Sequence, residues 1–158
     1  MSQAKAVASP SRQKLHGSIM LNVNNIPWLP FPLEGTSFKP LHIDDDQGKA
    51  TILLRVPAGQ HAEVHRHLAA VEVYVVQGGF TYEGEGSVAA GDYVYEPGGM
   101  VHEPVADSGG DDLVMFVVSQ GPIVGVNADG SPGGIIDNNL IYELARQGGA
   151  HGHLHRSL

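Results

Sequence analysis

The chain has 158 residues, a length that suits one domain around a single hydrophobic core. It contains no cysteine, which excludes disulfides, thiolate ligands and cysteine nucleophiles, so any metal must bind nitrogen and oxygen atoms. Seventeen Asp and Glu against nine Lys and Arg give a formal net charge of −8, which repels nucleic acid, and no apolar stretch has membrane-spanning or secretory character. We therefore expect a soluble cytoplasmic protein with neither a nucleic acid nor a membrane as partner.

The first elements in the chain are expected to be irregular. Residues 1–25 are predicted to form a loose arm. Three prolines within residues 26–32 exclude a helix and predict an extended apolar strap. The strap is expected to pack Trp28 and Phe31 onto a sheet of its own chain or onto a second subunit.

The rest of the chain has the composition of an all-β fold, because glycine and proline punctuate short segments rich in β-branched and aromatic residues. A single domain is expected over residues 26–147. Asp137 is a predicted N-cap for one short helix over residues 138–146, and residues 148–158 are expected to be a flexible tail. The predicted strands cover residues 37–43, 49–56, 63–67, 71–77, 80–83, 92–96, 113–119 and 123–127.

Three of the nine histidines suit a compact metal site. His65 and His67 are two residues apart on a predicted strand, so their imidazoles project from the same face. His102 follows a Pro-x-Gly turn after another strand. The tail histidines, at positions 151, 153 and 155, are expected to bind metal only adventitiously.

The motifs around these histidines are more specific than the histidines alone. Residues 59–79 read G-x5-H-x-H-x4-E-x6-G, and residues 91–102 read G-x5-P-x-G-x2-H. Together they resemble the two signature motifs of the cupin superfamily. The resemblance implies a single conical cupin β-barrel, also called a double-stranded β-helix or jelly roll, in which His65, His67 and His102 bind one divalent metal ion.

Glu72 is the fourth ligand candidate by the same resemblance. Its motif ends with a glycine after six residues, a count that Gly79 satisfies. If Gly78 is the turn residue instead, Val71 takes the ligand position and strand alternation points Glu72 out of the barrel. The sequence leaves both registers open.

Glu96 lies six residues before His102 and just ahead of the turn. There it could orient an imidazole or move a proton, or it could be an ordinary carboxylate that faces water. Three imidazoles and at most one carboxylate leave positions of an octahedral ion open, which favours catalysis over a structural metal. Iron(II), zinc, manganese and nickel would all accept these ligands.

A closer likeness extends over residues 26–142 and rests on residues 27–32, 51–59, 96–102 and 127–130. These stretches resemble the small single-domain cupins related to 2,4'-dihydroxyacetophenone dioxygenase and the acetylacetone-cleaving dioxygenase. That group binds non-haem iron(II) through three histidines, and in the acetylacetone-cleaving enzyme a glutamate also precedes the last ligand by six residues, as Glu96 does here. The resemblance implies a homodimer or higher homo-oligomer.

The first hypothesis is therefore an iron(II) dioxygenase that cleaves a carbon–carbon bond next to a ketone, with a β-diketone or hydroxyacetophenone-like substrate and dioxygen. The alternative is a non-enzymatic zinc cupin that resembles the sensory domain of certain anti-sigma factors. Those domains accompany a helical partner-binding segment, whereas only one short helix is predicted here. Candidate residues for the wall of the barrel are Arg55, Tyr74, Tyr95, Met100 and Phe116.

Overall fold

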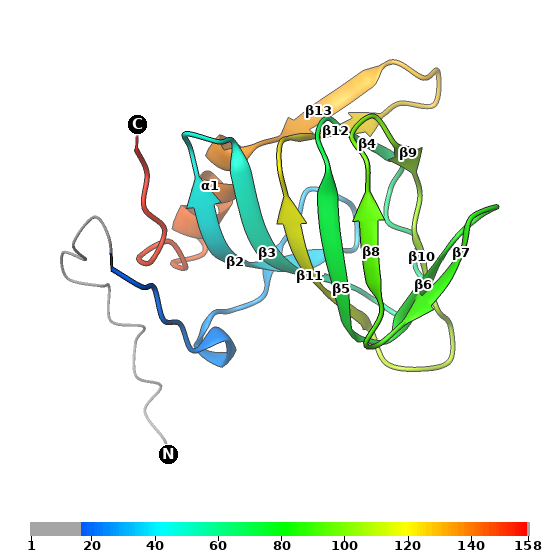
Figure 1. Cartoon of the computed structure of the whole chain (residues 1–158), viewed down its shortest axis with the longest axis horizontal. Helices are drawn as coiled ribbons and strands as arrows, with labels where there is room; N and C mark the ends of the chain where they lie inside the picture. Colours follow the sequence, from blue (N-terminus) through cyan, green and yellow to red (C-terminus); the bar gives the residue numbers. More distant parts are fainter. Residues whose placement is uncertain (1–16, 158) are drawn as a thin grey trace.

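A computed structural model describes residues 17–157 as a β-barrel closed at one side by a short helix (Figure 1). A 3-10 turn, η1 (Val23–Asn25), precedes the first strand, and α1 (Asn138–Gln147) follows the last. The strands are β1 (Leu29–Pro30), β2 (Ser37–Asp44), β3 (Lys49–Val56), β4 (His65–His67), β5 (Val71–Gln77), β6 (Gly79–Tyr82), β7 (Gly86–Ala89), β8 (Tyr93–Glu96), β9 (Val101–His102), β10 (Val105–Ala106), β11 (Leu113–Ser119), β12 (Ile123–Val126) and β13 (Pro132–Ile136).

The strands form three sheets whose inner faces share one core. The largest has the order β1-β2-β3-β11-β5-β8, the second β13-β12-β4-β9, and the third β10-β6-β7, with antiparallel pairing throughout the described strands. Side chains from all three sheets and from the strap line one interior cavity. The predicted all-β barrel with a short C-terminal helix is confirmed.

Strict alternation along β5 and β11 builds the core. Val71, Val73 and Val75 are buried, and the residues between them point outward. The branched side chains suit this pleated surface, and the buried apolar area is the main stabilising term of the fold. The sequence-predicted strands at residues 71–77 and 113–119 therefore have the predicted inside and outside faces.

The proline-rich strap packs on its own chain. Phe31 is buried and meets the ring of Phe38 edge to face, with centroids 5.3 Å apart. Trp28 lies on the outer side of the large sheet between two cations, 5.0 Å from Lys39 Nζ and 4.6 Å from Arg55 Cζ. Of the predicted loose arm, residues 1–16 lie outside the described part, while residues 17–25 include η1, where the Val23 carbonyl accepts a hydrogen bond from Lys39.

Helix α1 begins where the N-cap predicted it. The Asp137 carboxylate accepts the backbone N–H of Leu140 at 2.9 Å, and Gly148 and Gly149 follow the last turn. The buried side of the helix carries Ile141 and Ala145. No helix in the described part of the chain is long and apolar enough to cross a membrane.

The segment after the helix is docked, so the expectation of a flexible tail is wrong for residues 148–157. His153 is buried and donates from Nε2 to the carbonyl of Pro40 at 2.8 Å. Leu154 joins the core, and Arg156 Nε donates to the carboxylate of Asp45 at 2.7 Å. These contacts hold the chain end against β2 and the turn that follows it.

The alternation along β5 gives a matched pair of stability tests. Val75→Ala should lower the free energy of unfolding by about 2–3 kcal/mol, because it removes two buried methyl groups and leaves a cavity. Val76→Ala, the same change at a half-exposed neighbour, should cost less than about 1 kcal/mol. Urea unfolding followed by circular dichroism measures both, and equal losses would contradict the assigned faces.

The docked tail should make stability depend on pH through Asp45. The hydrogen bond from Arg156 holds the pKa of Asp45 below its ordinary value in the folded state, so this carboxylate stabilises the fold above that ordinary value and the contribution is lost as the pH falls. Asp45→Asn should therefore destabilise the protein at pH 7, and the gap from wild type should shrink toward pH 3. A gap that is the same at both pH values in urea titrations would exclude this linkage.

Candidate metal centre

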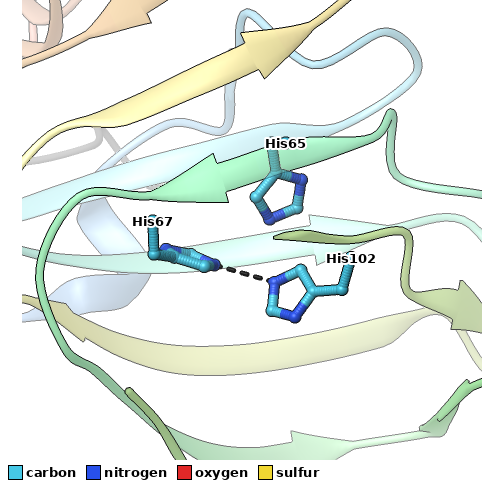
Figure 2. A group of neighbouring side chains, drawn as sticks. All are labelled: His65, His67 and His102. Atoms are coloured by element: carbon cyan, nitrogen blue, oxygen red, sulfur yellow. Dashed lines mark hydrogen bonds between the residues drawn. The ribbon is translucent and has the colours of Figure 1, made fainter. Parts of the chain in front are cut away.

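The pairing of two short strands assembles the histidine cluster. β4 carries His65 and His67 on its inner face, and the antiparallel register of β4 with β9 sets His65 opposite His102. All three side chains are buried, and one ligand atom from each lies within 4.8 Å of the others. Figure 2 shows the three imidazoles pointing toward one another from these two strands.

The distances within the cluster suit a shared cation. The Nε2 atoms of His67 and His102 are 2.8 Å apart, the dashed contact of Figure 2. Two ligand atoms at right angles around one ion, each about 2.1 Å from it, are separated by about 3.0 Å. His65 donates from Nδ1 to the Glu63 carbonyl at 2.7 Å, which leaves its Nε2 lone pair for the centre of the cluster.

Burial also favours the neutral, metal-binding form of His65 and His102. Removal from water lowers the pKa of His65 to about 4 and lowers the pKa of His102. The Nδ1 atoms of His67 and His102 are buried without a hydrogen-bond partner in the described chain, so the polar contacts of these two rings are made through Nε2. The donor set therefore fits a divalent ion held by nitrogen.

Glu96 completes the cluster with a carboxylate. It is 4% exposed, and its Oε2 atom lies 3.1 Å from His67 Nε2 and 3.7 Å from His102 Nε2. Burial by itself raises the pKa of Glu96, but hydrogen bonds with His67 and Tyr82 and the nearby imidazoles hold it below its ordinary value. Glu96 does not face water, and it can serve either as an oxygen ligand or as a base beside the ion.

Tyr82 is the residue that the sequence did not identify. From β6 its ring stacks on His102, with centroids 4.4 Å apart and planes 13° apart, and its hydroxyl donates to Glu96. Burial and the Glu96 carboxylate raise the pKa of the Tyr82 hydroxyl, which stays protonated. Strand alternation could have identified Tyr82 in the sequence, because it lies two residues after Phe80 and shares the inward face of that fully buried residue.

Glu72 lies apart from the cluster, so its candidacy as the fourth ligand is not supported. Val71, not Glu72, pairs with Glu96 across β5 and β8 and points inward. Glu72 points to the outer face, where it accepts a hydrogen bond from the Tyr93 hydroxyl at 2.7 Å. The turn residue is Gly78, with a φ of 72°, so the second of the two registers left open by the sequence is the observed one.

The cavity beside the histidines is small and mostly apolar. Its volume is about 40 Å³, and Glu96, Tyr82, His65 and His67 bring polar atoms to a wall of aliphatic side chains and Phe31. Three candidate wall residues, Tyr74, Tyr95 and Phe116, instead point outward and are exposed, and none of the five predicted wall residues lines this cavity. The apolar residues that do line it are Phe31, Leu33, Ile52, Leu54, Ala62, Val71, Val73, Pro104, Met115, Val117 and Ile123.

A conical β-barrel with three inward histidines on two adjacent strands defines the class of the protein as a cupin. More closely, residues 16–124 match the family described as the ChrR cupin-like domain, and the chain belongs to that family. No curated protein matches the chain at a significant level.

Solved structures agree on the fold. An RmlC-like cupin protein from Ralstonia eutropha superimposes with a TM-score of 0.76 at 26% identity, covering 89% of this chain and 93% of that one. An acetylacetone dioxygenase from Acinetobacter johnsonii has a TM-score of 0.73 at 18% identity, with 86% and 95% covered. The complex of Rhodobacter sphaeroides SigE with the anti-sigma ChrR gives a TM-score of 0.53 at 25% identity, with 61% and 50% covered.

The cluster predicts which substitutions disturb metal binding. Replacing His65, His67 or His102 singly by Ala should weaken binding of iron(II) or cobalt(II) by about 100-fold or more, because two imidazoles remain. Equilibrium dialysis with elemental analysis measures the bound metal, and circular dichroism checks that each variant folds. The matched control His61→Ala removes an exposed imidazole bound to Glu103 and should leave binding unchanged.

Proposed function

We propose that the protein is a non-haem iron(II) dioxygenase that cleaves a carbon–carbon bond next to a ketone. The observation that carries the proposal is Glu96, a buried carboxylate beside the three histidines in a cavity that is otherwise apolar. The shared fold with an acetylacetone dioxygenase supports it. Iron(II), when bound to the histidines, would supply the open coordination positions and the electrons that dioxygen chemistry needs.

In this proposal Glu96 is the base. A depressed pKa keeps Glu96 ionised at neutral pH, so the carboxylate can accept the proton from the carbon between two carbonyl groups. The hydrogen bond from the Tyr82 hydroxyl fixes one oxygen of that carboxylate and leaves the other directed at the histidines. Tyr82 is thus a positioning residue for Glu96.

The cavity favours a small substrate. One water molecule needs about 10–15 Å³ of such volume, so 40 Å³ holds a few water-sized groups. A β-diketone with short alkyl arms fits this space better than an aryl ketone. The aliphatic wall would keep water away from the reacting carbon, and the products would be a carboxylic acid and a second carbonyl fragment.

The proposal predicts oxygen consumption that depends on Glu96. Protein loaded anaerobically with iron(II) should consume oxygen with acetylacetone, and Glu96→Gln should lower kcat by about 100-fold or more, because the base is lost. Glu72→Gln, the same change on the outer face, should leave kcat unchanged. An oxygen electrode measures the rates, and no uptake with β-diketones or hydroxyacetophenones at full iron occupancy would overturn the proposal.

A second candidate is a zinc-binding regulatory cupin, which the family match and the likeness to the ChrR complex favour. In that case Glu96 would close a four-ligand site with the three histidines. Metal analysis of protein purified without added metal separates the two candidates. Stoichiometric zinc that does not exchange, together with a stable protein partner, would support the regulator.

We also propose a homodimer or higher homo-oligomer that works in the cytoplasm. Light scattering of the full chain tests whether the protein is an oligomer. A monomer at micromolar concentration would exclude the proposed homodimer or higher homo-oligomer.

A further inference from the structure

A second feature lies on the outside of the sheet that carries the histidines. Strand pairing sets Ile135 beside Val124, Val124 beside Arg66, and Arg66 beside Val101, so these four side chains form one outward row across β13, β12, β4 and β9. The exposed outer face of an antiparallel sheet is normally polar. Here a single arginine stands among aliphatic neighbours.

The row borders a hollow of about 310 Å³ in the region where the β12–β13 hairpin extends from the barrel in Figure 1. Leu68 and Ile135 are more than half exposed at its sides. Glycine keeps side chains out of one part of the hollow, because a Cβ atom on Gly133 would come within 3.2 Å of the Gly125 carbonyl group. The volume is at the lower end of the range of about 300–1,000 Å³ seen for small-molecule sites.

Arg66 has no hydrogen bond or ion pair with any residue in the described part of the chain, and its side chain is exposed in the hollow. The carboxylate on the adjacent hairpin, Asp129, is engaged locally by the backbone N–H and the hydroxyl of Ser131. The chain has a formal net charge of −8, so carboxylates outnumber cations, yet no carboxylate in the described part pairs with the Arg66 guanidinium. It offers a planar pair of N–H donors that match a carboxylate.

We infer that this hollow is a binding site for a small carboxylate with an apolar chain, whose head group pairs with Arg66 and whose chain lies along Leu68 and Ile135. The head-group charge complements the only charged side chain that lines the hollow, within the described residues. A second copy of this chain suits it less well, because a two-fold axis through the hollow would set two Arg66 guanidinium groups against each other.

The site is distinct from the histidine cluster and does not depend on the proposed activity. Arg66 lies between His65 and His67 in the sequence, and alternation along β4 directs its side chain to the opposite face of the sheet. An occupant of the hollow would therefore contact the strand that holds two of the three histidines without entering the cavity.

Isothermal titration calorimetry of the full chain with hexanoate, hexanol and hexylamine tests the inference. Hexanoate should bind once per chain and at least about tenfold more tightly than hexanol or hexylamine, because only the anion pairs with Arg66. Arg66→Gln should weaken hexanoate binding by about tenfold or more. The matched control Arg146→Gln removes an exposed cation on α1, which is paired with Glu143, and should leave binding unchanged.

Ile135→Ser should weaken the binding of hexanoate more than the binding of acetate, because only hexanoate has an apolar chain that reaches Ile135. This comparison tests the apolar wall separately from the charge of Arg66. Three outcomes would overturn the inference: no binding of hexanoate at millimolar concentration, equal affinity in the Arg66→Gln variant, or an oligomer that Arg66→Gln dissociates. Equal affinity would locate the carboxylate elsewhere, for example at a bound metal ion. A dissociating oligomer would identify the hollow as a subunit interface.

Discussion

The structure depends on the register between β4 and β9, two strands of three and two residues. That register sets His65 directly opposite His102, and the period of two along β4 sets His67 on the same face. A shift by one residue would turn the histidines of one strand to the outside. The longer strands around them, packed through alternating valines, are what hold so short a pairing in place.

Burying the polar groups of the cluster costs free energy of folding, and hydrogen bonds within the cluster offset part of that cost. Three imidazoles, a carboxylate and a phenol share an interior that is otherwise aliphatic, and each loses the hydrogen bonds that water would provide. Part of the loss is offset within the cluster, where Tyr82 donates to Glu96 and His65 donates to the Glu63 carbonyl. The Nδ1 atoms of His67 and His102 have no such partner in the described chain, so this part of the cost is not offset.

Two glutamates show how strand faces divide roles in this barrel. Glu96 and Val71 form an inward pair across β8 and β5, while Glu72 and Tyr95 form the neighbouring outward pair. The same carboxylate chemistry thus serves the interior cavity at one position and a tyrosine on the outer sheet at the other. β4 is divided in the same way, with histidines inside and Arg66 outside.

From the sequence alone, composition and periodicity predicted an all-β fold and capping predicted the helix after Asp137. The resemblance of the histidine motifs to those of cupins predicted the barrel and the three ligands. The sequence did not predict the short strands β1, β7, β9, β10 and β13, because segments of two to five residues carry little periodic signal. Glycine or proline weakens that signal further in β1, β7 and β13. The choice between Gly78 and Gly79 as the turn residue, and with it the direction of Glu72, could not be made from the sequence, because strand register is set by pairing with distant strands. For the same reason the sequence predicted neither the place of Tyr82 beside Glu96 nor the docking of the tail. Both depend on contacts between residues far apart in the chain, which no local pattern encodes.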